Sequence, residues 1–292
     1  MGVGDDCARV RVGAAMELAV TTDLLLEGRH FLPGAEPRAL GHKVLAVNLS
    51  DLAAIGASPR WFTLAIALEA IDEAWLEAFS AGLFALADRF GVDLIGGDTV
   101  RGPHLTIDIT AFGEVPAGCA LSRAAARPGD DIWVSGELGG AALGLVHPEI
   151  AAAARRLHEP EPRVVLGERL RRLAHAAIDI SDGLAGDLGH VLERSGVGAR
   201  IRYELLPKAA AFAQIRDAEL QKDCVLSGGD DYELLFTAAP GQRNEIGALS
   251  AELGLALTRI GAIEAAGAGL AVLDKNGMQM AYRSSFDHFA PA

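Results

Sequence analysis

The chain has 292 residues, half of them apolar, and a formal net charge of −13. This length suffices for two domains or one large one, and the acidic surface excludes nucleic acid and anionic membranes as partners unless divalent cations intervene. The three cysteines, Cys7, Cys119 and Cys224, form no CxxC pair, which predicts buried free thiols in a reducing cytoplasm. No apolar run approaches the ~20 residues that span a bilayer, and no stretch resembles a signal peptide.

The first half combines one clear amphipathic helix with several apolar runs. We expect this helix over residues 71–92, because Asp72 can cap it, apolar residues recur at helical spacing and Gly91 can end it. A second helix is expected over about 41–57. Strands are expected over the remaining apolar runs, at 18–23, 61–68, 92–98 and 104–115.

The segment 126–136 contains Pro128 and Gly129 and is the expected junction between two domains, 1–125 and 126–292. After it we expect a glycine-rich turn at 138–146, a helix over about 161–177, a strand, turn and helix within 177–196, and a helix near 242–253. The further expected strands lie at 199–205, within 224–237, at 255–263 and at 269–274. Helices and strands mix throughout, so the predicted fold class is α/β, in the mixed α+β sense.

Five acidic clusters lie beside glycines or at the ends of apolar runs. They are GDD (4–6), TTD (21–23), GGD (96–98), DISDG (179–183) and GGDD (228–231). Each one by itself also fits an ordinary turn, because Asp and Gly both favour turns. Their repetition instead favours a shared site of carboxylate oxygens, which are the ligands that Mg²⁺ prefers. Such carboxylates would repel one another in an empty site, so the expected ligand is a metal–phosphate complex.

Asp51 interrupts the apolar segment 47–57, VNLSDLAAIGA. On a helix, Asn48 and Asp51 are three residues apart and share a face, which would place both in the acidic pocket. The alternative is a solvent-facing stripe on an amphipathic helix.

Several common motifs are missing from the sequence. It contains no GxxxxGK[ST], no GxGxxG after a strand, no HExxH and no GxSxG. These absences argue against a P-loop enzyme, a dinucleotide fold, a zinc protease and a hydrolase with a nucleophile elbow. Any phosphates must then be held by Mg²⁺, backbone amides and a few basic side chains.

Seven motifs together make the chain resemble the thiamine-monophosphate kinase family, which shares its fold with aminoimidazole ribonucleotide (AIR) synthetase and selenophosphate synthetase. In chain order they are GVGDDCA, TTDLLLEGRHF, GHKVLAVNLSDLAAIGA, LIGGDTVRGP, AIDISDGLAGDLGH, LSGGDDYELLFT and FDHFA. The resemblance implies a two-domain fold and a homodimer whose N-terminal sheets pair. It also implies transfer of the γ-phosphoryl group of ATP to thiamine monophosphate, with several Mg²⁺ ions per site.

The resemblance further implies roles for individual residues. The implied metal ligands are Asp6, Thr22, Asp23, Asp51, Asp98, Asp179 and Asp182, with Thr21 as an additional contact. The implied nucleotide contacts are Gly97, Asp98, Arg123 and Ser181. The implied substrate contacts are His30, Asp230 and Phe286. Asp230 departs from the family, in which the motif reads GGED, so its carboxylate is one methylene shorter.

The implied acceptor is already a phosphate oxygen, so in-line transfer needs no general base and depends on alignment and charge neutralisation. For single residues, the alternatives are a satisfied core or turn histidine at His30, a solvated surface residue at Arg123 and simple tail packing at Phe286. For the protein, one alternative is a sister ATP-dependent enzyme of the AIR synthetase or selenophosphate synthetase type. The other is a non-catalytic protein that binds thiamine phosphates or nucleotide.

Overall fold

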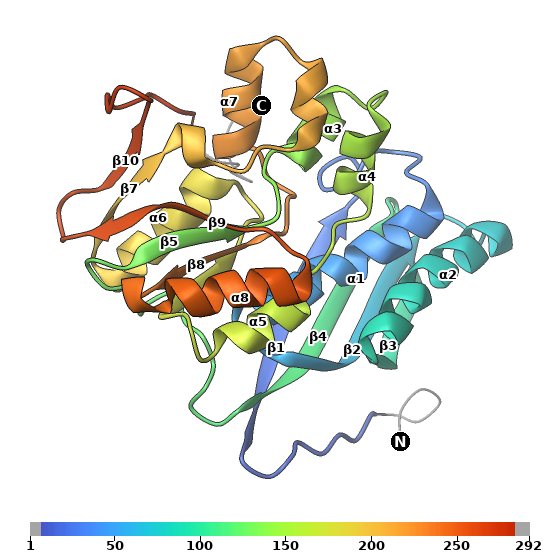
Figure 1. Cartoon of the computed structure of the whole chain (residues 1–292). Helices are drawn as coiled ribbons and strands as arrows, with labels where there is room; N and C mark the ends of the chain where they lie inside the picture. The colour runs from blue at the N-terminus through green and yellow to red at the C-terminus, as the bar shows by residue number, and fades with distance from the viewer. Residues whose placement is uncertain (1–6, 284–292) are drawn as a thin grey trace.

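The computed structural model describes residues 7–283, which form two β-sheets and eight α-helices (Figure 1). The predicted mixed α/β class is confirmed. The N-terminal half contains β1 (Met16–Leu26), α1 (Pro37–Ala54), β2 (Ser58–Leu68), α2 (Glu73–Phe90), β3 (Asp93–Arg101) and β4 (Thr106–Pro116). All six elements overlap the segments expected from the sequence.

The C-terminal half is built on a second sheet with the strand order β10-β7-β9-β5-β8-β6. Its strands are β5 (Asp131–Ser135), β6 (Ala176–Asp179), β7 (Gly198–Arg202), β8 (Leu234–Ala238), β9 (Leu257–Glu264) and β10 (Leu270–Leu273). Its helices are α3 (Gly140–Val146), α4 (Ala151–His158), α5 (Val164–Leu170), α6 (Leu184–Ser195), α7 (Ala218–Ser227) and α8 (Arg243–Leu253). Within residues 7–283, every helix is too short or too polar to span a lipid bilayer.

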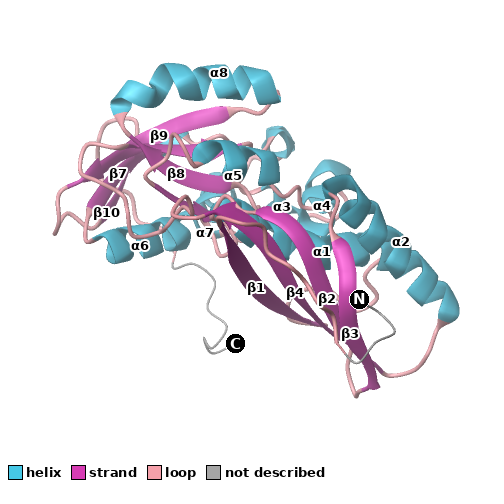
Figure 2. Cartoon of the chain, turned by 90° about the horizontal axis from the view of Figure 1, so that it is seen from below, coloured by secondary structure: helices cyan, strands magenta, loops and turns pink. Residues whose placement is uncertain are grey.

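The N-terminal sheet has the order β1-β4-β2-β3, and the helices of residues 7–283 cover one of its faces only. Helices α1 and α2 lie along that face (Figure 2). Side chains alternate accordingly in β4, where Ile107 and Ile109 are fully buried towards the helices and Asp108 is half-exposed. We call the side of this sheet that faces away from α1 and α2 the open face.

Apolar side chains of β1 point out of the open face. Leu18, Val20, Leu24 and Leu26 alternate with more buried neighbours, and Val20 is 57% exposed. Contiguous exposed apolar side chains of this kind mark surfaces that other molecules cover.

Local signals explain where the two N-terminal helices begin and end. Asp72 caps α2 by accepting a hydrogen bond from the N–H of Trp75, and Gly91 ends it with φ of 64°. Helix α1 starts four residues earlier than expected, because the Glu36 carboxylate caps it ahead of Pro37.

Two expectations for the C-terminal half are wrong, and two helices were missed. The helix expected over 161–177 is limited to α5, and residues 138–146 form α3 after a left-handed turn at Gly139, where φ is 78°. Helices α4 and α7 were not expected. The start of α7 carries a recognisable signal, since the Asp217 carboxylate accepts hydrogen bonds from the N–H groups of Glu219 and Leu220.

The prediction of buried thiols is also wrong for two of the three cysteines. All three are free, but only Cys224 is buried, in α7. Cys7 lies in the segment before β1 and Cys119 in the turn after Pro116, so neither belongs to an element that packs on the core.

Helix α1 joins the two halves. It packs on β1, β4 and α2 in its own half, and on α5 and β6 in the other. The approach to α5 is very close, because a Cβ atom on Gly167 would lie 2.0 Å from the carbonyl oxygen of Ala53. Residues on α1 are therefore held in fixed positions relative to both sheets.

Candidate active site

Three carboxylates from three elements lie close together, and we call them the acidic cluster. Asp23 comes from β1, Asp51 from α1 and Asp179 from the last position of β6. The Thr21 hydroxyl donates a hydrogen bond to Asp51, and Ser50 Oγ donates one to Asp179 Oδ2 at 2.7 Å. Ser50 and Asp51 are consecutive in α1, and they contact the C-terminal and the N-terminal half, respectively.

The acidic cluster is electrostatically unfavourable when no cation is present. Burial raises the pKa of Asp23 to about 7, and the charges of Asp51 and Asp179 add to this. Burial likewise raises the pKa of Asp179 to about 7, with a contribution from Asp51. Burial raises the pKa of Asp51, while the hydrogen bond from Thr21 and the charge of Arg123 lower it in part. A bound cation would relieve this repulsion.

These side chains fit a cation that is shared with a ligand. No group of three or more His, Cys, Asp or Glu side chains in residues 7–283 is arranged to hold a metal ion by itself. Mg²⁺ typically keeps several waters and takes one or two carboxylates together with substrate phosphates. Asp51 accepts a hydrogen bond from the Thr21 hydroxyl and Asp179 one from the Ser50 hydroxyl, and a carboxylate has about four acceptor positions, so both keep oxygen lone pairs for that purpose.

Within one chain, the structure does not bring Thr22 and Asp98 to the acidic cluster. Strand alternation puts Thr22 on the open face, where its Oγ1 lies 3.2 Å from Asp108 Oδ1. Asp98 is level with Ala65, which is level with Asp108, so Asp98 also lies on the open face. Two strands separate β3 from β1, which corresponds to roughly 14 Å.

The DISDG loop is organised by Asp187, which the sequence analysis missed. Its Oδ2 atom accepts hydrogen bonds from the backbone N–H groups of Ser181, Asp182 and Gly183, each at 3.1 Å. The loop therefore leads into α6 with the Ser181 and Asp182 side chains half-buried near Asp179. An aspartate in the first turn of a helix was the available signal.

The GGDD loop packs directly on the DISDG loop. A Cβ atom on Gly229 would lie 2.4 Å from the Ser181 carbonyl oxygen, and the Asp230 N–H donates to that same oxygen at 2.9 Å. Asp230 and Tyr232 both adopt positive φ, 67° and 50°. Such conformations cost ~1–3 kcal/mol each in non-glycine residues and persist only where the surroundings hold them.

Two acidic neighbours anchor this strained loop in the C-terminal half. The buried Asp231 accepts hydrogen bonds from the N–H groups of Gly139 and Ala141, at 2.6 and 3.3 Å. The buried Glu233 pairs with Arg156 and Arg163. The three acids of this segment thus differ in role. Asp230 is half-exposed, whereas Asp231 and Glu233 are buried and fix the backbone of the loop.

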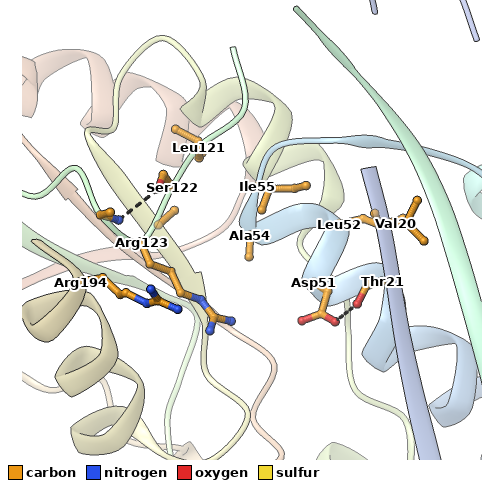
Figure 3. A pocket seen from close by; sticks show the side chains of 12 residues that line it. Val20, Thr21, Asp51, Leu52, Ala54, Ile55, Leu121, Ser122, Arg123 and Arg194 are labelled. Carbon is orange, nitrogen blue, oxygen red and sulfur yellow. Dashed lines mark hydrogen bonds between the residues drawn. The ribbon is translucent and has the colours of Figure 1, made fainter. Parts of the chain in front are cut away.

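A pocket of about 500 Å³ opens beside Asp51 (Figure 3). Arg123 and Arg194 extend into it from the side opposite Thr21 and Asp51, and apolar side chains including Ile55 form the wall between them. Arg123 is exposed, as its alternative interpretation required, yet it points into this pocket. Arg194 of α6 was not expected to be part of the site.

For the remaining expected residues, the structure gives local contacts or none that can be described. Gly97 allows close strand packing, because a Cβ atom there would lie 1.9 Å from the Leu64 carbonyl oxygen. His30 lies in the turn after β1, and its Nδ1 atom accepts a hydrogen bond from the Leu26 N–H. Asp6 and Phe286 lie outside the described residues.

Asn48 does not point into the acidic pocket as expected. It is fully buried, and its amide donates to the carbonyl of Val44 in its own helix. Ser50 takes the expected place, since it makes the contact with Asp179.

Family models match both halves of the chain. The model for the N-terminal domain of AIR synthase related proteins matches residues 4–115, and the corresponding C-terminal model matches residues 127–273. These segments contain the N-terminal and the C-terminal sheet, respectively.

Full-length relatives share both sequence and structure with the chain. The thiamine-monophosphate kinase of Salmonella typhimurium is 45% identical over 300 residues, covering 99% of this chain and 92% of the relative. The crystal structure of the enzyme from Stenotrophomonas maltophilia K279a has a TM-score of 0.89 at 47% identity, covering 96% and 92% of the two chains. A structure of AaThiL complexed with AMPPCP and TMP has a TM-score of 0.84 at 30% identity, covering 98% and 92%.

Proposed function

The chain belongs to the thiamine-monophosphate kinase family, and we propose that it transfers the γ-phosphoryl group of ATP to thiamine monophosphate in a magnesium-assisted reaction. The observation that carries this proposal is the acidic cluster, which combines carboxylates of both halves beside a pocket with two arginines. The complex of AaThiL with AMPPCP and TMP supports a nucleotide and a thiamine phosphate as the two ligands.

Asp23, Asp51, Asp179 and Asp182 would hold the Mg²⁺ ions, and Thr21 would orient Asp51. Bound Mg²⁺ would neutralise charge on the phosphates as the phosphoryl group transfers. Arg123 adds positive charge from the opposite wall of the pocket, where a guanidinium can bind phosphate oxygens as a fork. Asp6, Thr22 and Asp98 remain proposed metal contacts, Gly97 and Ser181 proposed nucleotide contacts, and His30, Asp230 and Phe286 proposed substrate contacts.

We propose in-line transfer without a general base. The accepting oxygen belongs to a phosphate that is largely deprotonated at neutral pH, so no proton has to be removed first. The task of the protein is then to align two anions that would otherwise repel each other. No aspartate of the cluster is assigned as a base.

We propose that the open faces of two copies pair in a homodimer. Support comes from the exposed Leu18, Val20 and Leu24, which would be covered by such pairing. The same face carries Thr22 and Asp98, so pairing would bring these residues close to the second chain. Sedimentation velocity should give a dimer for the wild type and a monomer for Val20→Asp; a monomeric wild type would rule the pairing out.

The decisive experiment mixes the protein with MgATP and thiamine monophosphate and measures thiamine diphosphate by chromatography. We expect thiamine diphosphate and ADP in equal amounts, and no ADP above background when thiamine monophosphate is omitted. Binding of both ligands without product would instead identify a carrier.

A further inference from the structure

Lys43 is a buried cation at the interface between the two halves. It lies on α1 with 3% of its surface exposed, in a helix whose neighbouring residues are mostly apolar. A buried ammonium group is costly unless it is paired. Its partner is Asp230 of the other half, with Nζ at 3.1 Å from Oδ2. The family motifs gave Lys43 no role.

Position along α1 separates Lys43 from the acidic cluster. Lys43 and Asp51 are eight positions apart in sequence, which corresponds to about 12 Å along a helix. The same helix therefore presents a carboxylate at the proposed metal site and an ammonium group about two turns away. In the proposed reaction the two phosphate groups bind at the Asp51 end of α1. The ring system of the acceptor would then extend from there towards Lys43 and Asp230.

Asp230 is held from two sides. Its Oδ2 atom accepts from Lys43 Nζ, and its Oδ1 atom accepts from the hydroxyl of Tyr232 at 3.1 Å. The side chain is still 33% exposed, so part of the carboxylate remains open to a ligand. Each carboxylate oxygen can accept more than one hydrogen bond, which leaves capacity after both contacts are made.

Tyr232 connects this pair to the acidic cluster. Burial raises the pKa of Tyr232 well above its usual value, and the charges of Asp230, Asp23 and Asp179 add to the shift. The phenol thus stays protonated and can donate to Asp230. The backbone conformations of Asp230 and Tyr232, both with positive φ, point the two side chains to the same region.

We propose that Lys43 is a positioning residue for the acceptor substrate. Together with Tyr232, it fixes the Asp230 carboxylate in one orientation for the ring system of thiamine monophosphate, which offers an amino group and a cationic thiazolium ring. A carboxylate that is already oriented loses less side-chain entropy when the substrate binds. This inference rests on the proposed function, because it concerns the acceptor of that reaction.

The test compares Lys43→Met, which keeps the length of the side chain and removes its charge, with the wild type. We expect the KM for thiamine monophosphate to rise at least ten-fold and the KM for ATP to stay within two-fold. Lys222→Met is the matched control, since Lys222 pairs with Glu219 on α7 and belongs to no proposed contact. It should change neither KM.

A double-mutant cycle separates positioning from a general loss of structure. If Lys43 acts through Asp230, Lys43→Met combined with Asp230→Asn should be no weaker for thiamine monophosphate than Asp230→Asn alone. Multiplying effects, or an unchanged KM in Lys43→Met, would overturn the proposal. If Lys43→Met does not fold, Tyr232→Phe serves instead, and the proposal then requires a raised KM for thiamine monophosphate only.

Calorimetric titration with thiamine monophosphate keeps this inference apart from the proposed function. A wild type that binds the substrate but forms no thiamine diphosphate would refute the function, while weaker binding by Lys43→Met would still support the positioning role. A wild type that turns over normally, with unchanged binding in the variant, would refute only the role of Lys43.

Discussion

Two groups of carboxylates, both buried or half-buried, differ in the groups from which they accept hydrogen bonds. Asp187 and Asp231 of the C-terminal half receive backbone N–H groups, and Glu233 receives two arginines as well as the hydroxyl of Ser135. In the acidic cluster, Asp51 and Asp179 receive hydroxyl groups and are surrounded by other carboxylates. The first group uses its acceptor capacity to hold loops in place, and the second keeps it for a ligand. Hydrogen bonds from arginines or from the backbone N–H groups of other residues, rather than the motif, therefore separate the first kind from the second.

The largest expected effect is on catalysis, from a change in the acidic cluster. Asp51→Asn removes charge but little volume, so turnover should fall roughly 100-fold or more while the fold is kept. Steady-state kinetics and urea unfolding measure the two properties. Unchanged turnover would remove Asp51 from the proposed metal site and weaken the distinction between the groups.

Metal removal should affect the proposed metal contacts, the acidic cluster among them, and not the carboxylates that hold loops in place. EDTA should abolish formation of thiamine diphosphate, and added Mg²⁺ should restore it. Mg²⁺ with ATP should also raise the midpoint of thermal unfolding in the wild type, and much less in Asp51→Asn. Activity that survives EDTA would contradict the proposed role of magnesium.

A change in the other group should affect stability instead. Glu233→Gln leaves two arginines without their buried partner, which should lower the free energy of unfolding by about 3 kcal/mol. Both KM values should stay within two-fold. Glu252→Gln is the matched control, because Glu252 forms an exposed pair with Arg169 and should change stability little. A raised KM in Glu233→Gln would show that the anchoring acid also acts on ligands.

The smallest expected effect is a change in pH dependence. Burial raises the pKa of Asp231 to about 7, so between pH ~4 and ~7 the folded state binds more protons than the unfolded state. The contribution of this group therefore lowers stability as pH rises through that window and is constant above it. In EDTA, Asp231→Asn should show a shallower slope than the wild type in urea unfolding at pH 5, 6, 7 and 8. An identical slope would mean that Asp231 titrates equally in both states.

Local patterns predicted much of the fold and fewer of the contacts. Helix α2 was found because its cap at Asp72 and its stop at Gly91 are encoded within one segment. The position of Asp98 depends on the strand order β1-β4-β2-β3, which no local pattern contains. The pair of Lys43 and Asp230 spans 187 positions in sequence and depends on the docking of the two halves. By contrast, Asp187 could have been identified from its place in the first turn of α6.

The contacts of Ser50 and Asp51 determine at which step of folding the acidic cluster forms. Ser50 bonds to the C-terminal half and Asp51 to the N-terminal half, so the cluster does not exist in either half alone. A folding intermediate with one native half would therefore lack it, and affinity for magnesium and nucleotide should emerge only at the final assembly step.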